Sequence, residues 1–174
     1  MISAILLTAG QSKRMNGENK LTKEIQGIPL IKHSVKNILF SYVNELIVVL
    51  GYQKEIVEKL IGKNKKMKIV FNKNFENGMA SSIKTGLNHF SEKTEAFFIC
   101  LGDMPLVNHN IYNQLIESKD NKEIIDNAIS GADLPPNLIP IGPKTLLICS
   151  PLNPDSLSLS HLFAWVFLLP RAPM

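Results

Sequence analysis

Four runs of apolar residues, separated by longer mixed segments, dominate the first 125 residues or so of the chain. They span residues 2–8, 45–50, 68–72 and 96–101. Each run is short, nearly uninterrupted, rich in β-branched or aromatic residues, and ends at or near Gly or Asn. Continuous apolar strands of this kind are typical of parallel sheets that are covered on both faces. The pattern therefore predicts four buried strands.

Apolar positions with helical spacing occupy the segments between these runs. They mark residues 30–40, 53–61 and 80–90, and a fourth segment that Asn108 can cap. Pro29 stands where a first helical turn begins, a place that accepts proline. Alternating strands and helices predict right-handed βαβ units, and hence an α/β fold with a doubly wound, mostly parallel sheet. Ligands of such sheets bind beyond the carboxyl ends of the strands.

The last 49 residues differ in composition from the rest. They hold eight of the ten prolines and only five charged residues, and they show little periodicity. We therefore expect one domain at residues 1–125, followed by an atypical Pro/Leu/Ser-rich segment at 126–174. Two interpretations of that segment stay open: a genuine but irregular final segment, or a terminus that is not the native ending. Its apolar stretch at 157–169 is too short to span a membrane.

Composition narrows the class of protein. The chain has 174 residues, enough for one domain, and its 45% apolar and 20% charged content is ordinary for a globular protein. The net charge of +4 suits a protein that handles polyanionic nucleotides, and no basic run with interleaved aromatics indicates a nucleic acid partner. Cys100 and Cys149 are far apart and flanked by apolar residues, so we expect buried thiols in a reducing cytoplasm. The apolar N-terminus lacks a basic region and is expected to be a strand rather than a signal peptide.

The loop that leaves the first predicted strand, residues 8–20 (TAGQSKRMNGENK), has the chemistry of a phosphate site. We expect Gly10 to turn the backbone with φ > 0, so that successive N–H groups converge on phosphate oxygens. Arg14 offers a fork of donors that suits a triphosphate, and Lys20 offers a mobile positive charge. The loop matches neither a Walker loop nor a GxGxxG fingerprint, and the alternative is an ordinary turn between a strand and a helix.

Two further segments follow predicted strands. Asp103, in LGDMP after the strand at 96–101, is placed to hold Mg²⁺ against substrate phosphates; the alternative is a turn-forming aspartate. Residues 77–82 (NGMASS) open a helix whose free N–H groups can bind a base or a phosphate; the alternative is a simple helix cap. Because strand ends converge in a parallel sheet, we expect Lys20 and Asp103 to meet across one cleft.

The segments ILLTAGQSKRMNGENKL, FNKNFENGMASSIKTGL and CLGDMPLV, in that order, resemble the nucleotidyltransferases of the molybdenum cofactor family. That family carries an LAAGxSxRMGxxK-type loop, an N-x-x-x-x-x-G-M-x-x-S element and a GDMP element. The resemblance covers about residues 2–125 and makes the domain at 1–125 a nucleoside triphosphate (NTP)-binding one. It implies a Rossmann-like fold of the nucleotide-diphospho-sugar transferase type and dependence on Mg²⁺. It also implies transfer of a nucleoside monophosphate to a phosphorylated acceptor, with release of pyrophosphate.

Carried over by position, the resemblance gives catalytic roles to Lys20, Arg14 and Asp103, with Asp103 also as the metal ligand. The nucleotide-binding residues that it implies are Thr8, Ala9, Gly10, Gln11, Ser12, Lys13, Asn72, Gly78, Ser81 and Ser82. Ser81 and Ser82 stand where the family approaches the base or the ribose. The pair Ala9-Gly10 resembles the cytidylyltransferase branch, because guanylyltransferases usually have two glycines there. That difference favours CTP over GTP as the donor and molybdopterin as the acceptor.

The resemblance ends near residue 125. Family members continue with a GxxGNP-type strand and a later acidic segment, and residues 126–174 contain no counterpart. Nucleotide binding survives this departure in principle, whereas turnover depends on what replaces the missing parts. Two other functions stay open: a transferase that uses GTP or sugar phosphates, and a non-catalytic nucleotide-binding module. A molybdoenzyme or its chaperone is the implied protein partner, and no membrane or nucleic acid is expected.

Overall fold

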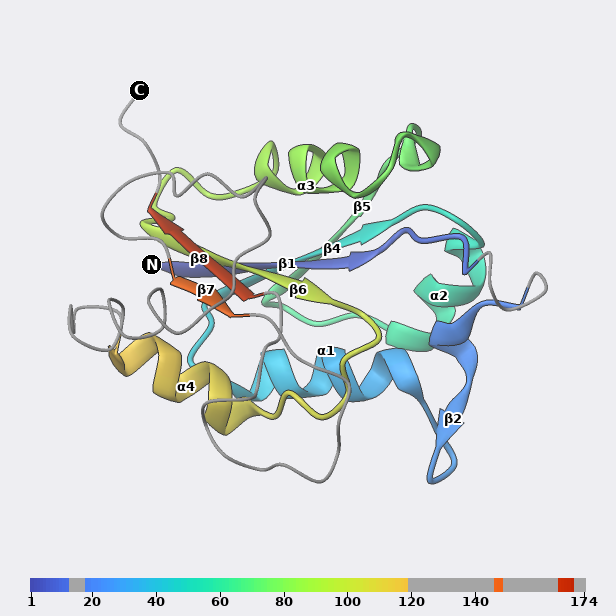
Figure 1. Ribbon diagram of the computed structural model, residues 1–174, viewed down its shortest axis with the longest axis horizontal. Helices are drawn as coiled ribbons and strands as arrows, with labels where there is room; N and C mark the ends of the chain where they lie inside the picture. Colours follow the sequence, from blue (N-terminus) through green and yellow to red (C-terminus); the bar gives the residue numbers. More distant parts are fainter. Residues whose placement is uncertain (13–17, 119–145, 149–165, 171–174) are drawn as a thin grey trace.

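A sheet of six strands in the order β5-β4-β1-β6-β8-β7 forms the centre of the molecule (Figure 1). The computed structural model describes residues 1–12, 18–118, 146–148 and 166–170. The four parallel strands are β1 (Ile2–Thr8), β4 (Glu45–Leu50), β5 (Met67–Phe71) and β6 (Ala96–Leu101). The antiparallel strands are β8 (Val166–Pro170), which pairs with β6, and β7 (Leu146–Ile148), which pairs with β8.

Helices cover both faces of this sheet (Figure 1). One face carries α1 (Leu30–Phe40), α2 (Lys54–Ile61) and α4 (His109–Ser118), and the other carries α3 (Met79–Leu87). Successive strand residues point to opposite faces, so Leu6 packs in the core under α1 and Ile5 packs in the core under α3. Burial on both faces explains why β1, β4 and β6 are nearly uninterrupted apolar runs, and the doubly wound α/β fold is confirmed. The expectation that all four strands are buried is wrong for β5, which lies at the edge of the sheet and buries only Val70.

The predicted elements agree closely with the structure. The strands at 2–8, 45–50 and 96–101 and the helix at 30–40 are confirmed with the same bounds. The remaining strand and the two middle helices are confirmed with ends that differ by one to three residues. The fourth helix begins after Asn108, whose Oδ1 accepts hydrogen bonds from the backbone N–H groups of residues 110 and 111 at 3.0 and 3.2 Å. The predicted cap is therefore confirmed.

Several short elements are not predicted by the sequence. They are the strands β2 (Glu24–Ile25) and β3 (Ile28–Pro29), and the 3₁₀ turns η2 (Lys20–Thr22) and η3 (Phe75–Asn77). Two or three residues are too few to show a period. The structure also places β7 and β8 in the segment 126–174, where the sequence indicates no regular element. Both strands lie beyond the edge of β6, so backbone pairing fixes their position rather than a local pattern.

Cys100 lies buried on β6, as predicted, and burial raises the pKa of its thiol to about 12. Cys149 lies outside the described residues. Across residues 1–12, 18–118 and the two tail strands, no helix has the length and apolar character needed to cross a membrane.

Candidate active site

A pocket of about 440 Å³ opens at the carboxyl ends of β1 and β6. Its walls come from the loop after β1, from η2, from the segment that contains η3 and the start of α3, and from the turn after β6. The lining residues are Leu7, Thr8, Ala9, Gly10, Gln11, Ser12, Lys20, Leu21, Phe75, Glu76, Gly78, Met79, Ser82, Leu101 and Asp103. This is the edge of the sheet at which the sequence predicts the site.

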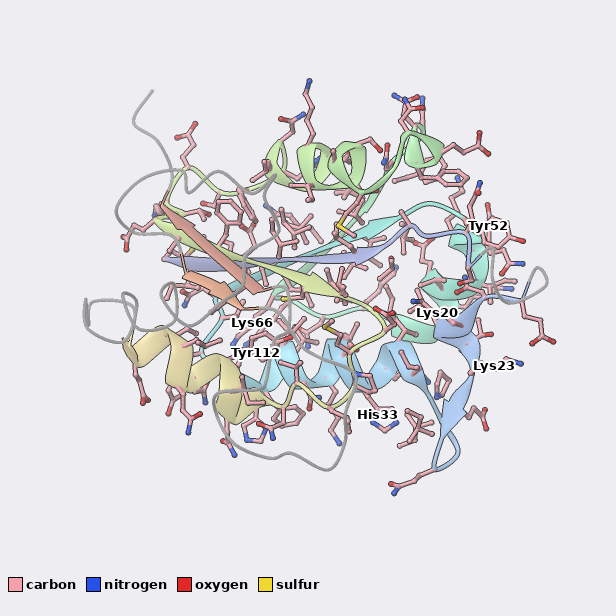
Figure 2. All side chains as sticks on the ribbon, viewed as in Figure 1. Lys20, Lys23, His33, Tyr52, Lys66 and Tyr112 are labelled. Carbon is pink, nitrogen blue, oxygen red and sulfur yellow. The ribbon has the colours of Figure 1, made fainter. Side chains whose placement is uncertain are left out.

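Lys20 and Asp103 form an ion pair in this pocket, although they are 83 positions apart in the chain. Lys20 is the first residue of η2, and Asp103 stands in the turn after β6. Figure 2 shows Lys20 and Tyr52 at the carboxyl end of the sheet. The meeting of Lys20 with Asp103 is the main spatial expectation from the sequence, and it is confirmed. The side chain of Lys20 is 46% exposed and that of Asp103 is 30% exposed, so both remain open to a ligand.

The loop after β1 lines the pocket from Thr8 to Ser12. Lys13 and Arg14 lie outside the described residues. The expectation that Gly10 turns with φ > 0 is wrong, because Gly10 is not among the glycines with positive φ, and in the described part of this loop it is Ser12 that has a positive φ, of 49°. The Ser12 hydroxyl accepts a hydrogen bond from the backbone N–H of Lys20 at 3.2 Å, and this contact ties the turn to η2.

Gly10 instead lines the pocket with backbone alone, because it has no side chain. A Cβ atom built on it would meet no atom within 4 Å. Thr8 lies deeper, at 1% exposure, and its hydroxyl donates to the carbonyl of Val49 at 2.8 Å. Thr8 therefore fixes the loop to β4, whereas Gly10 leaves room for a ligand.

The segment at 72–82 separates into residues that line the pocket and residues that lie behind it. Gly78 and Ser82 line it. Asn72 and Ser81, which the resemblance also assigned to nucleotide binding, are not among the lining residues. Asn72 is only 3% exposed, and its side-chain amide contacts both serines.

Two features of the wall are not predicted by the sequence. Gln11 donates to a carboxylate oxygen of Glu76 at 3.1 Å, which joins the loop after β1 to η3. Gly51 stands behind the wall, where an added Cβ would lie 2.6 Å from the Cβ of Ala9 and 2.7 Å from that of Phe75. The position therefore requires glycine for close packing. The run ELIVVLG shows a strand ending in glycine, but no sequence signal shows which segments approach it.

The carboxylates in the pocket decide whether a metal ion can bind there. Among the described residues, no group of three or more His, Cys, Asp and Glu side chains is arranged to hold a metal. Asp103 is the carboxylate beside Lys20, and the carboxylate of Glu76 is engaged by Gln11. Mg²⁺ is usually held by one or two carboxylates together with substrate phosphates and water. A single, partly exposed aspartate in this pocket fits that manner of binding.

Comparison with known proteins gives a family match over most of the chain. The model of the MobA-like NTP transferase domain matches residues 4–143. The chain is 30% identical over 125 residues to a probable molybdenum cofactor guanylyltransferase of Methanosarcina acetivorans. This match covers 70% of the chain and 54% of the relative. It is 25% identical over 134 residues to the bifunctional protein GlmU of Staphylococcus epidermidis, covering 76% of this chain and 29% of that protein. The chain thus spans about half or less of the length of these curated relatives.

Among solved structures, a nucleotidyl transferase from Methanothermobacter thermautotroptrophicus resembles the chain with a TM-score of 0.63 and 25% identity. The match covers 70% of this chain and 59% of the other. It agrees with the Rossmann-like interpretation of the sheet and its helices.

Proposed function

The chain belongs to the MobA-like NTP transferase family, and from this premise we propose that it transfers a nucleoside monophosphate from an NTP to a phosphorylated acceptor. The observation that carries the proposal is the meeting of Lys20 and Asp103 in a pocket at the ends of parallel strands. A cation and a carboxylate at such a place suit a triphosphate and its metal ion. We propose the cytoplasm as the location, because NTPs are supplied there.

The proposed chemistry is an in-line displacement. An oxygen of the acceptor phosphate forms a bond to the α-phosphorus, the bond from that phosphorus to the bridging oxygen breaks, and pyrophosphate leaves with the electron pair. Such a step needs positioning and charge stabilisation rather than a protein nucleophile. Lys20 would stabilise negative charge on the phosphate oxygens, and Arg14 would add a second cation. Asp103 would hold Mg²⁺, which when bound supplies further neutralisation of phosphate charge.

We propose CTP as the donor and molybdopterin as the acceptor. The Ala9-Gly10 pair supports this choice by its resemblance to the cytidylyltransferase branch. GTP is the second candidate, since the Methanosarcina relative carries the name of a guanylyltransferase. A molybdoenzyme or its chaperone would then receive the product.

The test is a pyrophosphate-release assay with CTP, GTP, UTP and ATP, with and without molybdopterin, in Mg²⁺ or in EDTA. The proposal expects release that requires both the metal and the acceptor. The isosteric variant Asp103→Asn and the variant Lys20→Ala serve as controls for the assigned site. Binding of a nucleotide without any pyrophosphate release would favour the non-catalytic binding module instead.

A further inference from the structure

We infer that Asn72 is a positioning residue that fixes Ser82 as a hydrogen-bond donor toward the bound nucleotide. The inference rests on the proposed nucleotide binding, and it assigns a hydrogen-bond donor to one wall of the pocket. Asn72 follows β5 and is itself held in place, because its backbone N–H donates to the carbonyl of Leu50 at 2.9 Å. It therefore links the ends of β4 and β5 to the start of α3.

The orientation of the Asn72 amide follows from its neighbours. The backbone N–H of Asn74 lies 2.9 Å from Oδ1, and an N–H group can only donate, so the oxygen must face it. The amide nitrogen then faces the two serines, at 2.8 Å from the Oγ of Ser81 and 3.0 Å from the Oγ of Ser82. A primary amide has two hydrogens to donate, and each of the two serine oxygens accepts one.

The two serines have different roles as a result. The hydroxyl of Ser81 lies 2.8 Å from the carbonyl of Asn74 and 2.9 Å from that of Gly78, so its single proton is used within the protein. The hydroxyl of Ser82 accepts from Asn72, and the described part of the chain offers it no acceptor. Ser82 lines the pocket at 4% exposure. Its proton is therefore available to an acceptor atom of the ligand.

The neighbours of Ser82 indicate which part of a nucleotide it faces. Phe75, Gly78 and Met79 line the same wall and are uncharged, and Glu76, which also lines it, carries a carboxylate that accepts a hydrogen bond from Gln11. Lys20 lies with Asp103 on the other side, in η2 and the turn after β6. A triphosphate suits the side that offers the Lys20 cation, which leaves the base or the ribose for the wall that contains Ser82. Asn72 thus makes this wall a donor, selective for a carbonyl oxygen, a ring nitrogen or a hydroxyl oxygen.

The test measures dissociation constants for CTP and for GTP by isothermal titration of the full chain in Mg²⁺. Ser82→Ala should weaken binding of the preferred nucleotide about three- to tenfold, the range of one net hydrogen bond. Thr85→Val is the matched control, because the Thr85 hydroxyl lies on the same helix, donates to the backbone carbonyl of Ser81 at 2.9 Å and is not among the lining residues; this variant should change affinity less than about twofold. Asn72→Asp keeps the shape and the contact with Asn74, but its second oxygen can only accept a hydrogen bond, so the Ser82 hydroxyl must donate to it and has no proton left for the ligand. We expect this reversal to weaken binding at least as much as Ser82→Ala.

The double variant separates positioning from a direct effect of charge. If Asn72 acts through Ser82, adding Ser82→Ala to Asn72→Asp weakens binding no further. Losses that multiply in the double variant, unchanged affinity in Ser82→Ala, or an equal loss in Thr85→Val would each overturn the inference. If Asn72→Asp does not fold, the comparison of Ser82→Ala with Thr85→Val decides. A wild-type chain that binds neither nucleotide would instead refute the proposed function.

Discussion

Replacing Asp103 by Asn should strengthen the binding of an NTP in the absence of metal. In the structure the carboxylate of Asp103 neutralises Lys20, the cation that we propose for the phosphates. A triphosphate must break that ion pair and must approach the carboxylate without a metal to shield it. The asparagine side chain of the variant has the same shape but no charge, so both penalties fall.

The exposures of the pair set the size of this effect. With side chains 46% and 30% exposed, the ion pair belongs to the class worth about 0.2–1 kcal/mol. Repulsion between the carboxylate and one phosphate charge at roughly 4 Å adds about 1 kcal/mol at a dielectric close to that of water. The sum of about 1–2 kcal/mol corresponds to a roughly five- to thirtyfold lower dissociation constant.

Titration calorimetry with CTP and GTP in EDTA, and again in Mg²⁺, measures the effect directly. Wild-type affinity should rise when Mg²⁺ is added, whereas the affinity of the variant should barely change. The variant should therefore bind the nucleotide more tightly than the wild type in EDTA and less tightly in Mg²⁺. Adding Lys20→Ala to Asp103→Asn should abolish the gain in affinity in EDTA, because the lysine that Asp103→Asn frees from its ion pair is then missing. A variant that binds in EDTA as weakly as the wild type would show that the pair does not restrain Lys20, and the reasoning would be refuted.

The other predictions concern single positions. Lys20→Ala should slow pyrophosphate release about 10²- to 10³-fold while thermal unfolding stays within a few degrees of wild type, measured by initial rates and by circular dichroism. Gly51→Ala should lower the free energy of unfolding by about 1–3 kcal/mol in urea titrations, because its methyl group overlaps the pocket wall, and an unchanged stability would contradict the packing. Gly10→Ala, with open space around its new Cβ, should keep that stability and weaken nucleotide binding instead. Burial acts to raise the pKa of Glu45, but the hydrogen bond and ion pair with Lys68 and the hydrogen bonds from Ser91 and Ser3 together hold this pKa below that of an ordinary glutamate. A carboxylate with a lowered pKa stabilises the fold above its unfolded pKa and loses that contribution as the pH falls through the folded value. Glu45→Gln should therefore flatten the loss of stability below about pH 4.5, and an unchanged slope there would rule this group out.

Much of the fold could be predicted because it follows from local patterns. The strand at 45–50 is buried on both faces and apolar from Leu46 to Leu50, and the helix at 30–40 shows one apolar face after a proline. The strands β2 and β3, which pair with each other in a separate small sheet, and the tail strands escaped prediction because pairing with a partner strand, rather than their own sequence, places them.

The site divides in the same way. The residues alone identify a basic glycine-containing loop, an aspartate after a strand and a small-residue helix start, and parallel strands bring their carboxyl ends to one edge. The sequence therefore determined which segments form the site. Only the tertiary structure decided the role of each side chain: that Ser12 rather than Gly10 takes the left-handed turn, that Asn72 lies behind the wall, and that Gly51 must lack a side chain. Those roles depend on distances between segments far apart in the chain, and such distances are set by packing rather than by any local period.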